Sequence, residues 1–258
     1  MDLAAYIRAR LERRRILLMT HLIVGHPSLD ANRRMLAAMA EADVDLVELQ
    51  MPFSEPIADG PAFARACQEA LARGLTLAQY FALLGESSAR HPFPHLMMGY
   101  YNVIMRAGPG AFCARLAAAG GAGCIVPDLP VEECKALAAA CQSRGLHLVQ
   151  LMAPTNTDQR LAQIAAHASG FVYAVARRGV TGRSSEITEE VRAFLARCRR
   201  HTALPLGVGF GLNSAAHLRQ LAGQAQIGIV GSALLGAWES GGEAGYRAFL
   251  EALAAGRQ

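Results

Sequence analysis

The amino-acid sequence predicts a single (β/α)8 TIM barrel over residues 1–258, with an extra helix at the N-terminus. Eight short apolar runs alternate with helical patterns, no linker or shift of composition divides them, and 258 residues is an ordinary length for one such barrel. An open doubly wound sheet would more naturally place a GxGxxG turn after its first strand. This chain has Gly25-His26-Pro27 there, which favours the closed barrel.

Hydrophobic periodicity and turn residues place the elements of the first half. The N-terminal helix is expected over residues 3–14, and Ser28 or Asp30 can cap a helix that runs to about Glu41. The other helices of this half are predicted at residues 62–73, 77–90 and 109–119. Its strands are predicted at residues 16–24, 46–49, 94–98 and 124–126.

The second half repeats the same alternation. Its helices are predicted at residues 131–144, 158–168 and 186–199, and Gly145 is the expected C-cap of the first of these. Its strands are predicted at residues 146–151, 171–176, 204–208 and 227–230. The last two strands each end in a glycine-rich turn that precedes another helix. The two halves together supply the eight strands that a closed barrel needs.

Composition and charge exclude several classes of protein. The net charge of +4 comes from scattered basic residues, so the short arginine clusters are expected to be solvated faces rather than a nucleic-acid site. No apolar run approaches the roughly 20 residues of a membrane span, and no signal-peptide core is present, so a cytoplasmic location is expected. The six cysteines show no CxxC and no ligand-like spacing with the histidines, which favours buried cysteines over metal sites or disulfides.

The stretch from Leu46 to Pro61 carries two acids of special interest. Glu48 interrupts a short apolar run that is typical of a buried strand, where an ionisable group is costly to bury. A loop rich in proline and glycine follows and delivers Asp59 just before Gly60-Pro61. These residues alone leave two interpretations open: a salt-bridged core glutamate with a turn-forming aspartate, or a catalytic pair.

The run Glu-Leu-x-x-Pro-Phe-Ser-Glu-Pro-x-Ala-Asp-Gly-Pro, which begins at Glu48, resembles the signature loop of the tryptophan synthase alpha subunit family. That family has aspartate where this chain has Glu55. The resemblance extends from about Thr20 to Ala233 and implies that Glu48 and Asp59 are the two catalytic carboxylates. It also implies cleavage of indole-3-glycerol phosphate to indole and glyceraldehyde 3-phosphate in tryptophan biosynthesis. The indole would pass to a beta subunit in an alpha–beta–beta–alpha heterotetramer.

Two glycine-rich turns follow the last two predicted strands, Gly209-Phe210-Gly211 and Gly231-Ser232. Glycines let backbone N–H groups approach an anion closely, and a short helix that begins at Ser232 would point its positive end toward the anion. The loops after strands seven and eight are the usual phosphate site of such barrels. Ordinary turn glycines are the alternative interpretation. The resemblance agrees with a phosphate site and adds Gly182 to it.

The resemblance implies roles for four more side chains in binding the substrate. The loop at residues 177–182 is similar to the family's sixth loop, whose threonine hydrogen-bonds the loop aspartate, which implies the same for Thr181. Tyr173 matches a tyrosine near the catalytic glutamate, and Tyr100 matches the tyrosine at the end of the third strand. His21 stands where the family usually has a phenylalanine near the substrate ring.

The implied chemistry is a retro-aldol cleavage, for which the sequence leaves one route. A Schiff-base aldolase needs a lysine at a strand end, whereas Lys135, the only lysine, lies in a predicted helix. No clustered histidines and carboxylates stand at suitable strand ends, so neither a metal nor any other cofactor is expected. Acid–base catalysis remains. Glu48 would shuttle a proton to indole C3 and from the glycerol hydroxyl, while Asp59 stays ionised and accepts the indole N–H.

Departures from the family pattern fall near the ring pocket and the rim that would face a partner. His26 replaces the aspartate of a Gly-Asp-Pro turn and Gln50 replaces a glycine, in addition to the changes at His21 and Glu55. Three other functions stay open. They are a stand-alone indole-3-glycerol phosphate lyase of a specialised pathway, a catalytically weak regulatory partner of a beta-type subunit, and a phosphosugar isomerase or epimerase. The last would leave the Pro-Phe-Ser-Glu-Pro loop unexplained.

Overall fold

Eight parallel strands close into one barrel in the computed structural model, which describes residues 2–175, 187–209 and 211–257. The strands are β1 (Leu17–Ile23), β2 (Leu46–Gln50), β3 (His95–Met98), β4 (Gly121–Ile125), β5 (His147–Met152), β6 (Val172–Val175), β7 (Leu206–Gly209) and β8 (Ile227–Val230). Strands that are neighbours in the sequence are neighbours in the barrel, and β8 closes the ring against β1. The predicted barrel is therefore confirmed, and the open doubly wound sheet is excluded.

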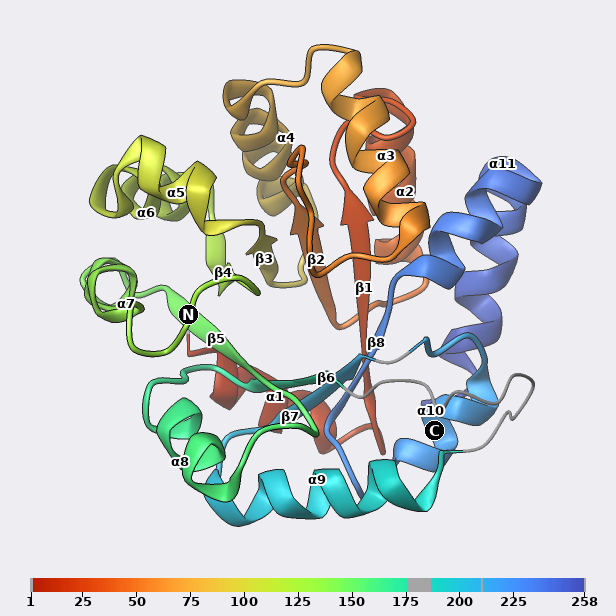
Figure 1. Ribbon diagram of the computed structural model, residues 1–258. Coiled ribbons are helices and arrows are strands. Elements are labelled where there is room, and N and C mark those ends of the chain that lie inside the picture. The colour runs from red at the N-terminus through yellow and green to blue at the C-terminus, as the bar shows by residue number, and fades with distance from the viewer. Residues whose placement is uncertain (1, 176–186, 210, 258) are drawn as a thin grey trace.

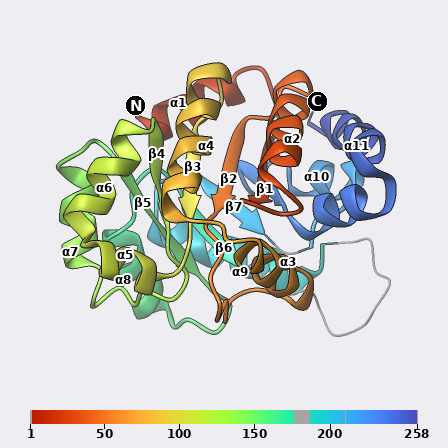
Figure 2. The ribbon, with the colours of Figure 1, turned by 90° about the horizontal axis from the view of Figure 1, so that it is seen from above.

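Most of the helices surround the barrel in chain order (Figure 1). The helices of the described residues are α1 (Leu3–Leu11), α2 (Leu29–Glu41), α3 (Pro61–Ala72), α4 (Leu77–Arg90), α5 (Tyr101–Ala107), α6 (Pro109–Ala118), α7 (Lys135–Gln142), α8 (Asp158–Ala166), α9 (Glu189–His201), α10 (Ala215–Leu221) and α11 (Ser232–Ala254). The predicted extra helix is α1, whose Leu3 and Ile7 pack with the apolar residues inside the barrel. Figure 2 shows the same ring of helices from a second direction. None of these helices is long and apolar enough to cross a membrane.

The element boundaries differ from the predicted ones where a start signal is missing or misleading. Helix α5 was not predicted, because its N-cap Tyr100 makes no side-chain capping bond and the segment carries no other start signal. Strand β4 begins earlier than predicted, at Gly121, where an added Cβ would lie 2.4 Å from a Leu116 carbon. This glycine therefore permits close packing and does not form a turn. Helix α7 begins at Lys135, later than predicted, because hydrogen-bonded turns occupy the preceding residues.

The alternation of side chains along β1 and β2 decides which residues reach the barrel interior. Met19 of β1 and Leu46 of β2 belong to the interior apolar cluster, whereas Leu49 packs outward in the layer between strands and helices. The parallel register places Met19 beside Leu46 and His21 beside Glu48. His21 and Glu48 therefore follow their apolar neighbours into the interior, at the end where the strands finish.

Candidate active site

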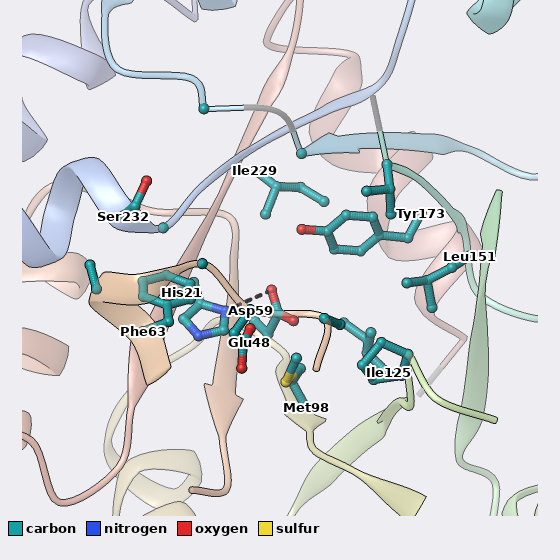
Figure 3. A pocket seen from close by; sticks show the side chains of 18 of the residues that line it. His21, Glu48, Asp59, Phe63, Met98, Ile125, Leu151, Tyr173, Ile229 and Ser232 are labelled. Atoms are coloured by element: carbon teal, nitrogen blue, oxygen red, sulfur yellow. Dashed lines mark ion pairs between the residues drawn. The ribbon is translucent and has the colours of Figure 1, made fainter. Parts of the chain in front are cut away.

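A cavity of about 500 Å³ opens at the C-terminal end of the barrel, and Glu48 and Asp59 both line it (Figure 3). Met98, Ile125 and Leu151 form an apolar side of the cavity, and Ile229 of β8 adds a fourth apolar side chain across from them. His21 and Phe63 line the cavity near the two acids, and Tyr173 projects from β6. The site therefore combines a surface suited to an aromatic ring with two carboxylates.

Glu48 is a buried acid with one oxygen that lacks a hydrogen-bond partner among the described residues. Its side chain projects from the middle of β2, and the residue is only 2% exposed. The Oε2 atom lies 3.2 Å from Nδ1 of His21, which is an ion-pair distance, but no aligned hydrogen bond reaches this oxygen. A buried carboxylate oxygen without a donor is costly. Because Glu48 lines the cavity, a molecule bound there can donate a hydrogen bond to this oxygen or exchange a proton with it.

Asp59 is held in place by two donors, in contrast to Glu48. Its Oδ2 atom accepts hydrogen bonds from Nε2 of Gln50 at 2.6 Å and from the Tyr100 hydroxyl at 3.0 Å. The same hydroxyl accepts the Ala58 N–H at 3.1 Å, which fixes the loop that carries Asp59. Burial raises the pKa of Asp59 above its ordinary 3.8, while the His21 charge and the two donors act in the opposite direction. The donors thus support an ionised Asp59 against the effect of burial.

Tyr100 and Tyr173, both predicted to bind substrate, occupy different places. Tyr100 is buried and is not among the residues that line the cavity, so it positions Asp59 from behind. Tyr173 lines the cavity directly, and burial raises the pKa of its phenol. An added Cβ at Gly209 would lie 2.4 Å from the Tyr173 hydroxyl, so this glycine makes room for the phenol.

His21 and Gln50 form a polar connection that the sequence indicated only as departures from the family pattern. The His21 ring stacks on Phe63 with centroids 4.5 Å apart, and its Nε2 lies 2.7 Å from Oε1 of Gln50. Burial lowers the pKa of His21, but the charges of Glu48 and Asp59 outweigh burial and leave it above 6.5. One sequence signal could have located Gln50: it stands two residues after Glu48 in a strand, and so shares its face.

The opposite side of the cavity is lined by backbone, as the glycine-rich turns suggested. Gly209, Gly211, Gly231 and Ser232 all border it, and Ser232 is the first residue of α11. Helix α11 continues to Ala254 with a break at Gly242, so it is longer than the short helix predicted. Neither lysine nor arginine occurs among the described residues that line the cavity.

Three predicted site residues, Thr181, Gly182 and Phe210, lie outside the described residues, as does the whole of the loop at 177–186. Within the described ranges, no group of three or more His, Cys, Asp or Glu side chains is arranged to hold a metal ion.

The closed parallel barrel carries two acids in a cavity at the ends of its strands, and glycine-lined turns after β7 and β8 lie on the opposite side of that cavity. This is the architecture of a (β/α)8-barrel enzyme that acts on a small molecule. The family model described as tryptophan synthase alpha chain matches residues 7–253. The chain belongs to the tryptophan synthase alpha chain family, a family of lyases in tryptophan biosynthesis.

Individual relatives agree with this assignment over nearly the whole chain. The tryptophan synthase alpha chain of Syntrophotalea carbinolica is 41% identical over 247 residues, which cover 96% of this chain and 98% of that one. That of Roseiflexus castenholzii is 45% identical over 224 residues, covering 86% and 85%. A crystal structure of tryptophan synthase from M. tuberculosis, in an open form with BRD0059 bound, matches with a TM-score of 0.91 at 32% identity, covering 99% of this chain and 98% of that chain.

Proposed function

We propose that Glu48 and Asp59 are the catalytic pair with which this member of the family cleaves indole-3-glycerol phosphate to indole and glyceraldehyde 3-phosphate. The observation that carries the proposal is the contrast between the two acids in one cavity. Glu48 keeps a buried oxygen without a donor from the described residues, which suits a group that gains and loses a proton. Asp59 is stabilised by two donors, which suits a group that stays charged.

The proposed reaction moves one proton through Glu48 in each direction. Protonated Glu48 gives its proton to indole C3, which creates an indolenine whose C=N accepts the electrons of the breaking C–C bond. The resulting carboxylate then takes the proton of the glycerol hydroxyl next to that bond, and an aldehyde forms. Asp59 uses Oδ2 for its two donors, so Oδ1 can accept the indole N–H and stabilise positive charge on the ring.

The two ends of the substrate fit the two sides of the cavity. The indole ring matches the apolar side chains of Met98, Ile125, Leu151 and Ile229, which surround the space beside the two acids. The phosphate would lie at the turns after β7 and β8, where backbone N–H groups and the start of α11 favour an anion. In this proposed arrangement, the bond to be cleaved would lie between the two carboxylates and the phosphate.

The decisive experiment is indole release by the Glu48→Gln variant. The amide cannot shuttle a proton, so turnover should fall by ~10²–10⁴-fold while the protein still folds. The Glu55→Asp variant, which changes an exposed acid in the adjacent loop, is the matched control and should retain turnover. Near-normal indole release by Glu48→Gln would overturn the assignment of this residue.

The partner proposed for this chain is a tryptophan synthase beta subunit, in a cytoplasmic alpha–beta–beta–alpha assembly. Two large apolar side chains of the described residues are exposed, Ile57 at 80% and Met105 at 61%. They lie in the segments that follow β2 and β3, on the same face of the barrel as the cavity mouth. A solved tryptophan synthase complex from Pyrococcus furiosus matches this chain with a TM-score of 0.84 at 32% identity, covering 92% of this chain and 97% of that chain.

Docking on this face should activate the lyase by favouring the arrangement in which the loop acid is correctly placed. Steady-state indole formation by the purified chain, titrated with a cognate beta subunit, tests this. Ile57→Ser should weaken the activation and leave the rate of the isolated chain unchanged. Full activity alone, unaffected by any beta subunit, would instead favour the stand-alone lyase.

A further inference from the structure

A continuous polar connection joins Glu48 to Asp59 through two intervening side chains. Nδ1 of His21 lies 3.2 Å from Glu48 Oε2, and its Nε2 lies 2.7 Å from Gln50 Oε1. The amide nitrogen of Gln50 then donates to Asp59 Oδ2 at 2.6 Å. The two acids of the proposed mechanism are therefore not independent of each other.

The donor and acceptor roles along this connection follow from its Asp59 end. An ionised carboxylate can only accept, so the amide nitrogen of Gln50 faces Asp59 and its oxygen faces His21. That oxygen also only accepts, so Nε2 of His21 must carry a proton. The remaining ring nitrogen, Nδ1, is then the one that gains or loses a proton, and it faces Glu48.

The charged groups that act on His21 are both acids, Glu48 from β2 and Asp59 from the following loop. From α3, the neutral Phe63 ring covers one face, and Cys67 contacts the Gln50 amide at 3.5 Å. Burial raises the pKa of the Cys67 thiol to about 12, so it stays neutral.

Strands β3 to β8 also contribute residues to this cavity. Tyr173 comes from β6, and burial keeps its phenol neutral, while β8 contributes only Ile, Gly and Val. His21 thus lies between two acids. Among the described residues, His26 and Tyr246 line a second, small cavity with it; burial lowers the pKa of His26 and raises that of Tyr246, so both favour their neutral forms.

We infer that His21 stores the proton of Glu48 between the two steps of the reaction, and that Gln50 and Asp59 orient its ring for this task. The inference rests on the proposed function. In the resting site, an imidazolium faces the Glu48 carboxylate. Transfer of the Nδ1 proton gives neutral His21 and protonated Glu48, which delivers the proton to indole C3. The proton that Glu48 then takes from the hydroxyl returns to Nδ1, so each cycle ends with the proton count unchanged.

His21 acts through Glu48 and is therefore a positioning residue. The alternative interpretation is that the His21 ring only packs against the substrate. The pH dependence of kcat separates the two. With His21 present, the pair holds its proton until the imidazolium deprotonates above pH 6.5, but in His21→Phe the carboxyl alone must hold it. The basic limb of the profile should move to lower pH in His21→Phe, because a carboxyl group is a stronger acid than an imidazolium. At pH 8, kcat should fall by about tenfold or more, with a smaller change in KM.

A matched control is available at the other end of the barrel. His91 also stacks on a phenylalanine, Phe93, with centroids 5.5 Å apart, and it does not line the cavity. The His91→Phe variant should leave the pH profile of kcat unchanged. A basic limb that stays in place in His21→Phe, with only KM altered, would overturn the inference and leave His21 as a packing residue.

A second measurement reads the proton without any turnover, so it distinguishes failure of this inference from failure of the proposed function. Nitrogen-15 NMR of the His21 ring in the free chain should show Nε2 protonated throughout and Nδ1 titrating above pH 6.5. Glu48→Gln should lower that midpoint, and Gln50→Met, which keeps the volume but removes both hydrogen bonds, should release Nε2 so that both tautomers appear. A His21 midpoint at or below 6.5 that Glu48→Gln does not move would overturn the inference. Absence of indole release by the wild-type chain would overturn the proposed function instead.

Discussion

Two buried acids, one just before β2 and one in the middle of it, have contrasting surroundings. Asp45, directly before the strand, is fully buried and is surrounded by donors. Its Oδ1 accepts from Arg10 at 2.8 Å and Arg14 at 2.7 Å, and its Oδ2 accepts from the Leu18 N–H at 2.9 Å and Arg257 at 3.1 Å. Glu48, farther along the same strand, has one histidine nearby and an oxygen without a donor from the described residues.

The difference shows how one barrel separates stability from chemistry. The N-terminal face of such barrels holds stabilising interactions, while the C-terminal face holds the reactive groups. Asp45, directly before β2, binds Arg10 of α1, Arg14 in the segment after that helix and Arg257 near the end of the chain. Glu48 does not join separate segments of the chain in this way, and it faces the cavity. The number of partners of a buried acid, rather than burial itself, therefore distinguishes the structural acid from the reactive one.

The largest expected effect on stability is at Asp45. The Asp45→Asn variant keeps the shape of the side chain but leaves three arginines around a neutral amide. Breaking a buried ion pair by removing one partner costs about 3–5 kcal/mol, so the free energy of unfolding should fall by that amount. Urea denaturation measures it. In the matched Glu48→Gln variant, the same free energy should stay near the wild-type value. Equal losses in the two variants would contradict the distinction between the structural acid Asp45 and the reactive acid Glu48.

Two buried histidines extend the comparison to pH. His95 in β3 contacts Ser87 Oγ at 2.7 Å, and burial lowers its pKa from 6.5 to about 4. The unfolded chain therefore binds this proton first as the pH falls below 6.5, which destabilises the fold progressively down to pH 4. The loss is about 3 kcal/mol, from 1.36 kcal/mol per pKa unit. His21 differs in sign, since its raised pKa gives stability below pH 6.5 that is lost as the pH rises through the folded value.

The measurement is the free energy of unfolding between pH 4 and pH 6.5 for the wild type and for His95→Gln, which keeps a hydrogen-bonding group for Ser87. The variant should show a shallower dependence on pH in this window. Parallel curves for the two proteins would mean that His95 accepts a proton in the folded state as readily as in the unfolded chain.

A smaller effect is expected at the glycine-lined side of the cavity. In Gly209→Ala, the added methyl group would lie 2.4 Å from the Tyr173 hydroxyl, so the phenol or the turn must move. Overpacking of this kind costs about 1–3 kcal/mol, and most of it should appear as a higher KM, by roughly tenfold. Gly236→Ala in α11 is the control, since an added Cβ there meets nothing within 4 Å. Unchanged kinetics in Gly209→Ala would remove this turn from the substrate site.

The smallest effect is thermal protection by inorganic phosphate. Binding at ten times the dissociation constant stabilises the folded state by about 1.4 kcal/mol, which differential scanning fluorimetry detects as a higher Tm. Gly209→Ala should reduce the protection, and Arg13→Ser, in an exposed basic cluster at the start of the chain, should not. Protection that depends on Arg13 rather than on the glycine turns would contradict the phosphate site proposed at the ends of β7 and β8.

The predicted elements were correct wherever a periodic pattern lay between clear signals. Ser28, one of the two predicted caps of α2, accepts a hydrogen bond from the Ala31 N–H, and β8 has the predicted bounds. Predictions failed where glycine served packing instead of a turn, as at Gly121, or where a short helix lacked a cap, as in α5. Local signals were thus sufficient for most elements but not for those defined by contacts from elsewhere in the chain.

The sequence by itself determined the barrel, the family and the two acids in the loop and strand that face the cavity. Each of these rests on residues that are close together in the chain, so local patterns are enough to find them. Only the tertiary structure decided how the polar groups are connected. It placed Tyr100 behind Asp59, surrounded Asp45 with arginines, and joined His21 to Gln50. These contacts depend on the register of neighbouring strands and on segments that meet after folding, and buried strands with apolar residues on both faces leave little trace of that register in the sequence.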